Sequence, residues 1–377
     1  MSHRINVMRP WLGQEEAAAV SEVLASGWVA QGPKVAAFEE AYAAAMQVPY
    51  AVATSSCTTA LHLALVVAGV QAGDEVVVPS FSFVATANAP TYVGATPVFA
   101  DVDELTGNLT ADTVAAVLTP RTRAVIVVDQ GGVPADLAPL RAVADPRGIT
   151  VIEDAACGVG ATYQGRPVGA GAEITAWSFH PRKIITTGEG GMLTSTRQDW
   201  ADRARRLREH AMSVSAAERH RSLLPVAEQY DEVGFNYRMT DLQAAVGLVQ
   251  LDRLPAIVGR RRELAARYTE AIGAITGLRP VADPPWGESS FQSYWVEVGP
   301  DYGLDRDGLL GALAEHDISA RFGIMAAHRQ PAHADRAHAA LPVTERLTDR
   351  TLILPMFHEM TVEEQDRVIA VLRSGRG

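Results

Sequence analysis

Residues 178–191 read SFHPRKIITTGEGG and place a single lysine, Lys183, between a strand-like run and a glycine-rich turn. The overlapping segment ITAWSF, residues 174–179, has the β-branched and aromatic content of a buried strand, and GMLTS at 191–195 indicates another. We therefore expect Lys183 on a strand-to-strand connection. An arbitrary lysine is most often a solvated loop residue, so the case for Lys183 as a cofactor anchor depends on the segments around it.

Two carboxylates end the strand-like run that precedes this segment. In VIEDAA, residues 151–156, Glu153 and Asp154 stand before small residues that suit a tight turn. Enzymes of the α/β class place their chemistry at strand ends. On its own, the pair would be explained more readily as a cap for the next segment.

A third segment predicts an anion site. AVATSSCTTALHLAL, residues 51–65, runs from a short strand through the small polar residues 55–59 into an amphipathic helix. Unpaired backbone N–H groups at a helix N-terminus, reinforced by hydroxyls, can hold a phosphate. An ordinary Ser/Thr helix cap is the alternative explanation.

Together, the three segments fit the chemistry of pyridoxal phosphate. A Schiff base needs a neutral amine, so an anchoring lysine must have a pKa well below the ordinary value of about 10.4. We expect partial burial beside a cationic cofactor to lower the pKa of Lys183 in this way. A protonated pyridine nitrogen also needs a carboxylate beside it, which Asp154 would supply.

The order of phosphate turn, aromatic segment FSFVAT, Asp154 and Lys183 resembles the fold type I pyridoxal phosphate enzymes. More narrowly, the chain resembles the DegT/DnrJ/EryC1/StrS family of sugar aminotransferases. The resemblance covers nearly the whole chain, from RPWLGQEE near the N-terminus, through GFNYRMTDLQAAVGLVQL at 234–251, to LPMFHEMTVEE near the end.

This resemblance implies a role for each matching residue. Lys183 would carry the cofactor as the internal aldimine, Asp154 would partner the pyridinium nitrogen, and Phe83 would stack on the ring. The residues implied at the phosphate are Cys57, Thr58, Thr59, Ser178 and, from the neighbouring subunit, Asn236. The family likeness therefore implies a homodimer with shared active sites.

Some positions depart from the commoner family pattern. Cys57 stands where glycine is frequent, and Cys157 stands where glutamine or histidine often reaches the phenolic oxygen of the cofactor. Asp129 replaces a histidine. We take Asp129, His328 and Arg238 as candidate substrate residues because of their motif positions, and a packed or capped His328 is an open alternative.

The activity implied is transfer of an amino group from an amino acid, by family habit L-glutamate, to a nucleotide-linked keto sugar, with pyridoxamine phosphate as intermediate. The form SFHPxKxITTGEGG is more similar to members that act at C4 of 4-keto-6-deoxyhexoses than to C3 enzymes. C3 ketosugars and inososes are alternative substrates. A related dehydratase would carry histidine in place of the anchoring lysine, whereas this chain has Lys183. A non-catalytic sensor would have lost Lys183 or Asp154, and both residues are present.

Composition excludes several other classes of protein. The 377 residues include 33 basic and 44 acidic side chains, a net charge of -11, which argues against nucleic acid binding. The two cysteines form no disulfide framework, and the chain shows neither a signal-peptide core nor a membrane-spanning run, so we expect a cytoplasmic protein. Histidines at 328, 333 and 338 match no metal-site spacing, and we expect no metal.

Short apolar strands alternate with helices over residues 50–196, a pattern that predicts a mostly parallel α/β sheet flanked by helices. We predict a large cofactor-binding α/β domain at 1–252 and a smaller C-terminal α+β domain at 253–377. The arginine-rich stretches at 202–210 and 260–268 predict solvated helix faces.

Overall fold

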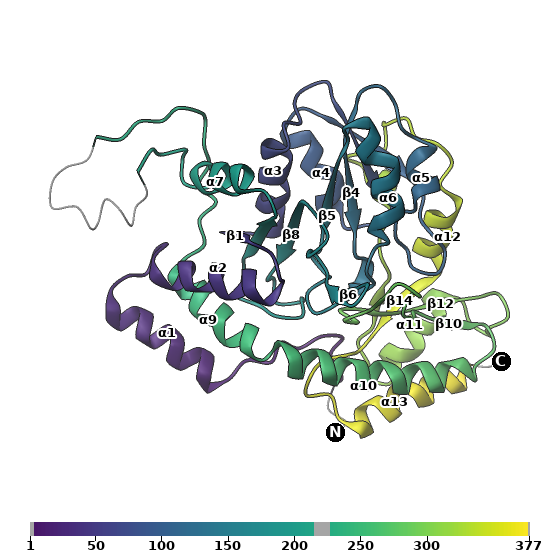
Figure 1. Cartoon of the computed structure of the whole chain (residues 1–377). Helices are drawn as coiled ribbons and strands as arrows, with labels where there is room; N and C mark the ends of the chain where they lie inside the picture. Colours follow the sequence, from purple (N-terminus) through teal and green to yellow (C-terminus); the bar gives the residue numbers. More distant parts are fainter. Residues whose placement is uncertain (1–3, 215–226, 376–377) are drawn as a thin grey trace.

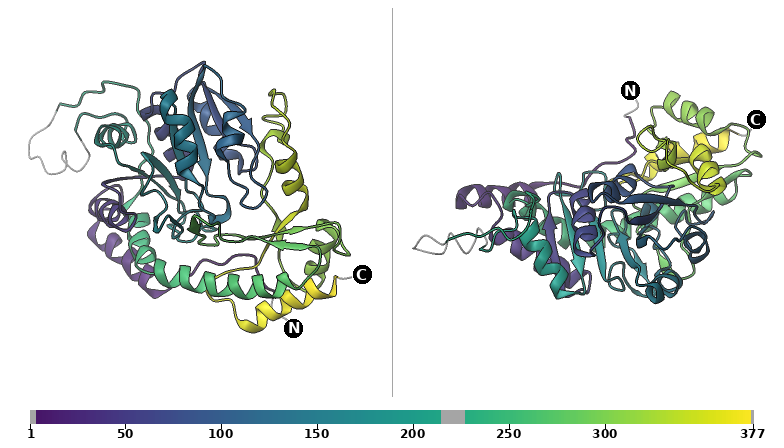
Figure 2. Two further views of the ribbon diagram at one scale, coloured as in Figure 1. Left: turned by 45° about the vertical axis from the view of Figure 1, so that its right-hand side comes forward. Right: turned by 90° about the horizontal axis from the view of Figure 1, so that it is seen from above.

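The computed structural model describes residues 4–214 and 227–375. Figure 1 shows a large part built around a central sheet and a smaller part that contains the C-terminal elements. The long helix α10 (Leu254–Gly273) runs along the bottom of the molecule in Figure 1, and the left view in Figure 2 shows it there as well. Both chain ends lie beside the smaller part.

The central sheet has, within the described residues, seven strands in the order β1-β9-β8-β5-β4-β2-β3. Their bounds are β1 (Tyr50–Thr54), β2 (Glu75–Pro79), β3 (Thr96–Ala100), β4 (Thr122–Val128), β5 (Thr150–Asp154), β8 (Ile174–Ser178) and β9 (Gly191–Ser195). Only β9 among them runs antiparallel to its neighbours, β1 and β8. The predicted mostly parallel sheet is therefore confirmed.

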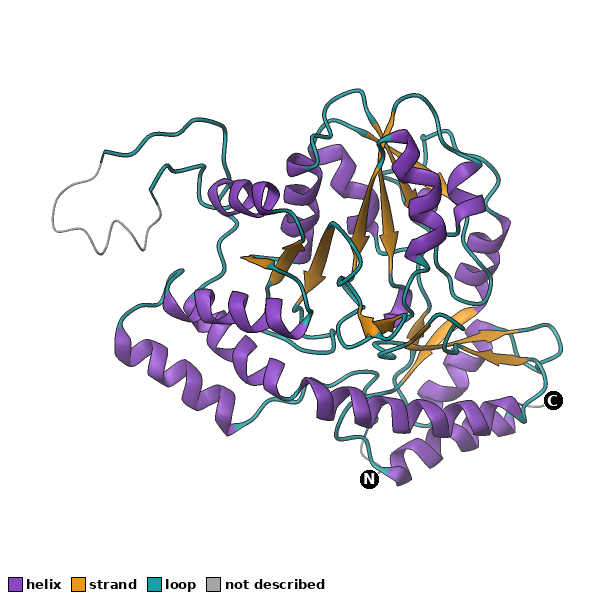
Figure 3. Cartoon of the chain, in the orientation of Figure 1, coloured by secondary structure: helices purple, strands orange, loops and turns teal. Residues whose placement is uncertain are grey.

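Helices cover both faces of this sheet (Figure 3), which explains why its strands are near-continuous apolar runs. One face packs on α3 (Cys57–Val67), α4 (Val84–Tyr92) and α7 (Gln198–Leu207). The other packs on α2 (Pro33–Ala45) and α9 (Asp241–Asp252) beside β1, and on α5 (Ala111–Ala115) and α6 (Leu137–Ala144) beside β4. Successive residues serve opposite faces, since Val76 and Val78 join the first core and Val77 joins the second.

The C-terminal part has its own antiparallel sheet of four strands in the described residues, ordered β10-β12-β14-β13. Its strands are β10 (Leu278–Pro280), β12 (Tyr294–Val298), β13 (Arg321–Phe322) and β14 (Thr351–Leu354), and its helices are α10, α11 (Arg306–Glu315) and α13 (Val362–Ser374). Ile5 joins this core, and its N–H donates to the Asp317 carbonyl at 2.9 Å. The N-terminal segment thus packs on the smaller part, and the domain boundary at 252/253 stays a prediction.

The remaining elements connect these two cores. Helix α1 packs on α9, and β11 from the C-terminal part pairs with β6 from the larger one. Their bounds, with the other short elements, are α1 (Gln14–Ser26), β6 (Thr162–Tyr163), β7 (Arg166–Pro167), β11 (Gly287–Glu288), α12 (Pro342–Arg350), and the 3-10 turns Gln130–Gly132, Asp145–Arg147 and Ala327–Arg329.

The prediction of solvated arginine faces is wrong for two residues. Arg261 on α10 is buried and donates to the carbonyls of Phe291, Gln292 and Met356. Arg208 is also buried and pairs with Glu39. Each guanidinium group donates to acceptors inside the protein, which for Arg208 are Glu39 and the Ala53 carbonyl, and sequence patterns do not reveal such contacts.

Across residues 4–214 and 227–375, no helix combines the length and the apolar character that crossing a membrane requires. The same residues contain no group of three or more His, Cys, Asp or Glu side chains arranged to hold a metal ion.

Candidate active site

A cavity of about 1070 Å³ opens at the carboxyl ends of the central strands. Val128, Asp154 and Ser178, the last residues of β4, β5 and β8, all line it. The C-terminal part supplies a second wall through residues 319–325. The cavity therefore lies between the two cores, where the sequence predicted chemistry at strand ends.

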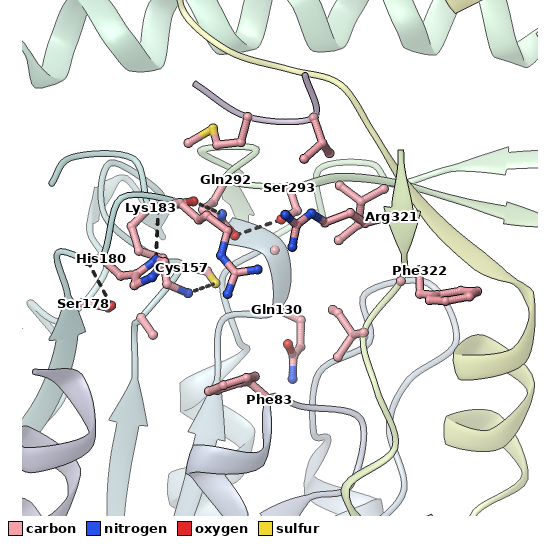
Figure 4. Close-up of a pocket in the computed structure, with 18 of the residues that line it drawn as sticks. Phe83, Gln130, Cys157, Ser178, His180, Lys183, Gln292, Ser293, Arg321 and Phe322 are labelled. Carbon is pink, nitrogen blue, oxygen red and sulfur yellow. Dashed lines mark hydrogen bonds between the residues drawn. The ribbon is translucent and has the colours of Figure 1, made fainter. Parts of the chain in front are cut away.

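Lys183 lines the cavity from the connection between β8 and β9, as its motif predicted. Its Nζ atom donates to the sulfur of Cys157 at 3.2 Å (Figure 4). The lowered pKa that we predicted is not found for the protein chain by itself. Burial lowers the pKa of Lys183, but Cys157, Cys57 and Asp154 raise it, and the net shift is upward. The expected lowering also depended on a positive cofactor, whose charge the chain does not supply.

Asp154 is 3% exposed and is held by three neighbouring groups. The Thr86 hydroxyl donates to Oδ2 at 2.8 Å, the Ala156 N–H donates to Oδ1 at 3.2 Å, and the Cys57 thiol lies 3.8 Å from Oδ1. Burial raises the pKa of Asp154 above its ordinary value, although these hydrogen bonds lower it. A buried carboxylate of this kind is stabilised by a cationic partner, which a pyridinium group would provide.

The start of α3, where the sequence predicts an anion site, lies at the cavity. Ser56 caps the helix, and Ser56, Cys57 and Thr58 line the cavity. Thr59 is instead turned into the cap, where its hydroxyl accepts from the Ser56 N–H at 3.1 Å. A Cβ atom at Gly191 would lie 2.3 Å from the Ser56 carbonyl carbon, so only glycine lets β9 approach this turn.

Two further predicted cofactor residues border the same space. Phe83, at the start of α4, is 63% exposed and lines the cavity. Ser178 is buried and its hydroxyl oxygen accepts from the His180 N–H at 3.5 Å. Figure 4 shows Phe83 below Lys183, with Ser178 on the same side as the lysine.

The family model of the DegT/DnrJ/EryC1/StrS aminotransferase family matches residues 10–373. The chain belongs to this family. It is therefore an enzyme, a pyridoxal-phosphate-dependent sugar aminotransferase of fold type I. The buried carboxylate, the cavity lysine and the exposed aromatic ring described above fit that cofactor.

Several solved structures of aminotransferases resemble this DegT/DnrJ/EryC1/StrS member over nearly their full lengths. Aminotransferase TlmJ from Streptoalloteichus hindustanus is 38% identical, with 98% of each chain covered and a TM-score of 0.91. DesI, solved in the presence of its TDP-sugar product, is 32% identical, with 99% of this chain and 93% of that chain covered and a TM-score of 0.90. The putative sugar aminotransferase Spr1654 from Streptococcus pneumoniae, in its PMP-form, is 27% identical, with 100% and 99% covered and a TM-score of 0.92.

Two candidate residues of this family member lie away from the cavity of their own chain. Asn236 is exposed and forms an isolated backbone bridge with Glu209. Arg238 is half-buried, and its guanidinium lies 3.7 Å from the Glu209 carboxylate. Neither residue lines the cavity of its own chain.

The structure also places His328 and Asp129 behind the cavity wall. His328 is buried, with Nδ1 2.6 Å from the Ser80 hydroxyl and Nε2 3.4 Å from Glu345. This is the packed histidine that the sequence left as an alternative. Asp129 is fully buried, and its Oδ1 accepts from the Ala135 N–H at 2.9 Å. Neither side chain lines the cavity, so both act on a ligand only through other residues.

Sequence reasoning missed several residues that line the cavity. Thr86 lies in the quoted aromatic segment, but nothing in the sequence showed that its hydroxyl reaches Asp154. In the C-terminal wall, the sequence drew attention only to the segment that contains His328, residues 323–331, and not to residues 319–322. The missed residues that are labelled in Figure 4 are Gln130, His180, Gln292, Ser293, Arg321 and Phe322.

Proposed function

We propose that this aminotransferase moves an amino group from L-glutamate to a nucleotide-linked keto sugar, at C4 of a 4-keto-6-deoxyhexose. One observation carries the proposal. The cavity joins Lys183 and Asp154 on the side of the sheet to exposed arginines on the other walls, so a single ligand can reach both. C3 ketosugars and inososes stay alternatives that the experiment below separates.

The sheet side of the cavity supplies groups for each part of pyridoxal phosphate. Asp154 would hold the pyridinium nitrogen and Phe83 would cover one ring face. The start of α3, with Cys57 and Thr58, would hold the phosphate together with Ser178. Thr59 would support this turn through its capping hydrogen bonds. When bound, the cofactor supplies a carbonyl carbon that carries the amino group and a ring that accepts electrons.

Lys183 has two tasks in this reaction. Its amine attaches the cofactor between turnovers and moves a proton when it is free. Both tasks need the neutral amine within reach of the bound ring, and Lys183 lines the cavity on the same side as Asp154. The two half-reactions use the same lysine in opposite directions, which predicts ping-pong kinetics.

Arginines around the cavity favour an anionic substrate in a protein of net charge -11. Arg4, Arg182 and Arg321 are exposed and line the cavity, and none forms an ion pair with another residue in the described part of the chain. Guanidinium groups bind phosphate oxygens in a bidentate manner. The TDP-sugar product named for DesI supports a nucleotide diphosphate as the group recognised here.

We also propose a homodimer in which Asn236 from a second copy reaches the phosphate, and a cytoplasmic location. Asn236 is exposed and lies outside the cavity of its own chain, which is the placement that a shared site requires.

The test is an absorbance titration of the protein with pyridoxal phosphate, then L-glutamate, then a panel of nucleotide 4-keto sugars, nucleotide 3-keto sugars and an inosose. We expect a cofactor band that requires Lys183, is bleached by glutamate and is restored by a 4-keto sugar. Lys183→Ala is the matched variant because it removes the amine, together with the side chain beyond Cβ.

Restoration by a 3-keto sugar or an inosose instead would overturn the C4 assignment and keep the reaction class. Bleaching by another amino acid but not by glutamate would overturn the donor. A band that forms normally in Lys183→Ala would overturn the proposed anchor.

A further inference from the structure

A short segment of the C-terminal part contacts the turns that carry the predicted site residues. We call residues 290–293, which lie between β11 and β12, the linking segment. Its Ser290 and Ser293 N–H groups donate to carbonyls of the turn 131–132, which follows β4, at 3.2 and 3.0 Å. The Ser290 hydroxyl donates to the Cys157 carbonyl at 3.3 Å, in the turn that follows β5. The linking segment thus joins the C-terminal part to two turns at the carboxyl ends of the central strands.

Gln292 in the linking segment reaches a third turn, the one that carries Lys183. Its Nε2 atom donates to the Arg182 carbonyl at 2.7 Å, and its Oε1 atom accepts from the Ser293 hydroxyl at 2.9 Å. Figure 4 shows Gln292 between Lys183 and Ser293, and all three residues line the cavity. Because both ends of the amide are bonded, the direction in which Nε2 donates is fixed.

The bond from Gln292 acts on the peptide group that joins Arg182 to Lys183. A peptide group is planar, so its orientation is fixed when both its oxygen and its hydrogen are bonded. Gln292 holds the oxygen, and the Lys183 N–H donates to the His180 carbonyl at 2.8 Å. Among the described residues, Gln292 alone donates to the Arg182 carbonyl. Loss of this donor therefore frees one end of the peptide group from which the Lys183 side chain extends.

The backbone of the linking segment is strained and is held by a buried side chain. Phe291 has a φ of 47°, in the left-handed region that residues other than glycine rarely adopt. Such strain persists only where the surrounding structure enforces it, and it gathers at functional sites. Arg261 donates to the Phe291 and Gln292 carbonyls at 2.8 and 2.7 Å. The position of Gln292 is consequently set by a buried arginine of α10.

Other groups hold the rest of the lysine turn. The Thr186 hydroxyl donates to the Phe179 carbonyl at 2.8 Å, and Gln243 of α9 donates to the Glu189 carbonyl at 2.7 Å. Both bonds involve residues that follow the lysine in the sequence. The linking segment acts on the residue immediately before it.

We propose that Gln292 is a positioning residue for Lys183. By fixing the peptide group before the lysine, it holds the amine in the place that attachment of the cofactor needs. A displacement of about 1 Å can lower a reaction rate about a hundredfold. The bond should therefore matter more to the reaction than to the fold. The inference rests on the proposed role of Lys183 as the cofactor lysine, and Gln292 acts through that lysine.

Two substitutions of Gln292 remove the donor. Gln292→Leu keeps a side chain of similar size without polar atoms, and Gln292→Glu keeps the length and replaces the donor with an oxygen. Gln164 is the matched control, since its Nε2 also donates, to the Tyr163 hydroxyl at 3.1 Å, but it lies outside the cavity. Gln164→Leu should leave each quantity measured below unchanged. If one Gln292 variant fails to fold, the other still provides the test.

The first experiment measures hydrogen–deuterium exchange in the cofactor-free protein by peptide mass spectrometry. We expect the amides of residues 180–187 to exchange about tenfold faster in both Gln292 variants than in wild type, because the peptide group before Lys183 is released. The amides of β8 should exchange as in wild type. Equal exchange over residues 180–187 in wild type and both variants would overturn the inference.

The second experiment combines the Gln292 substitutions with Lys183→Ala in a double-mutant cycle. In protein that contains Lys183, both substitutions should slow attachment of pyridoxal phosphate about tenfold, as measured by stopped-flow absorbance. In Lys183→Ala, where the cofactor binds without attachment, they should leave its dissociation constant unchanged. A weaker affinity in that background would show that Gln292 contacts the cofactor directly, and the positioning role would be wrong.

These outcomes separate the inference from the proposed function. If the cofactor attaches to Lys183 at the same rate in wild type and in both Gln292 variants, only the positioning role fails. If no cofactor attaches to Lys183 in the wild type, the proposed anchor fails, whatever the exchange experiment shows.

Discussion

The Thr86 hydroxyl donates a 2.8 Å hydrogen bond to Asp154, from the first turn of a helix to the end of a buried strand. Thr86 also lies 2.9 Å from the Ser82 hydroxyl, so its own oxygen is held in place. The bond favours the anionic form of a carboxylate whose burial favours the neutral form. Thr86 therefore opposes the effect of burial on the pKa of Asp154.

Thr86→Val removes this donor and keeps the shape of the side chain. We expect the dissociation constant for pyridoxal phosphate to rise about tenfold, since a hydrogen bond to a charged group contributes about 1.5–3 kcal/mol. Fluorescence or absorbance titration measures the change. Thr86→Ser should restore most of the affinity, and equal affinities for all three proteins would show that the bond is dispensable.

Phe83→Ala should separate binding from stability. The ring is 63% exposed in the chain, so its loss should change the free energy of unfolding by no more than about 0.5 kcal/mol. The affinity for pyridoxal phosphate should fall, because the ring is proposed to cover one face of the cofactor. Denaturation without cofactor and cofactor titration give the two quantities, with Phe83→Tyr as the control that keeps a ring. A large loss of stability would show that the ring serves the fold instead.

Arg321→Ala tests the arginine walls of the cavity. The KM for the nucleotide sugar should rise about tenfold or more, because a guanidinium contact with phosphate is lost, whereas the KM for glutamate should stay unchanged. Arg147, exposed on a 3-10 turn outside the cavity, is the matched control for substitution by alanine. An equal rise for both substrates would remove Arg321 from the nucleotide site.

Subunit mixing tests whether Asn236 acts across a dimer. Asn236→Asp places a negative charge at the proposed phosphate site, and Lys183→Ala removes the anchor. If each site combines Lys183 from one copy with Asn236 from the other, half of the dimers formed on refolding the two inactive proteins together are mixed dimers, and each mixed dimer has one intact site of two. The mixture should therefore recover about a quarter of the wild-type activity. Activity assays of the mixture and of each protein alone provide the comparison, and no recovery would place both residues in one chain's site.

Glu153 predicts a pH dependence of stability. Burial, partly offset by the Thr175 hydroxyl, raises its pKa to about 7. The folded chain therefore binds more protons than the unfolded chain between about pH 4.5 and 7, and stability falls as the pH rises through this window. Glu153→Gln should raise the free energy of unfolding at pH 8 by at most about 3 kcal/mol, because glutamine carries no charge to bury. The same substitution should have little effect at pH 4. Unfolding curves of wild type and Glu153→Gln at both pH values measure this change in the free energy of unfolding. An identical change at pH 4 and pH 8 would show that Glu153 does not titrate in this window.

The central sheet could be predicted because strands covered on both faces are apolar along their length, and glycine, proline and polar residues separate them. The same logic singled out Asp154 at a strand end, whereas Ser178 was implied by the family resemblance. Lys183 could be placed from its motif. These features depend on neighbours in the sequence, which is the range that pattern reasoning covers.

The features that were missed depend on contacts between distant segments. Residues 319–325 become a cavity wall because β13 pairs with β14 and because Ala326 bridges Phe81. Arg261 looked solvated until three carbonyls from other segments surrounded it. Asp129 was expected at the substrate, but the Ala135 N–H and the turn at Gly158 hold it behind the wall. No local pattern specifies such pairings.

The way β14 completes the C-terminal sheet has a consequence for the making of the enzyme. Strand β13 lies inside the wall segment and has β14 as its partner strand, so it pairs only after residues 351–354 have been synthesised. Ile5 of the N-terminal segment packs on the same C-terminal core. During translation the lysine turn is thus complete well before its cavity exists. We therefore expect the nascent chain to bind the cofactor only after most of the C-terminal part has been synthesised.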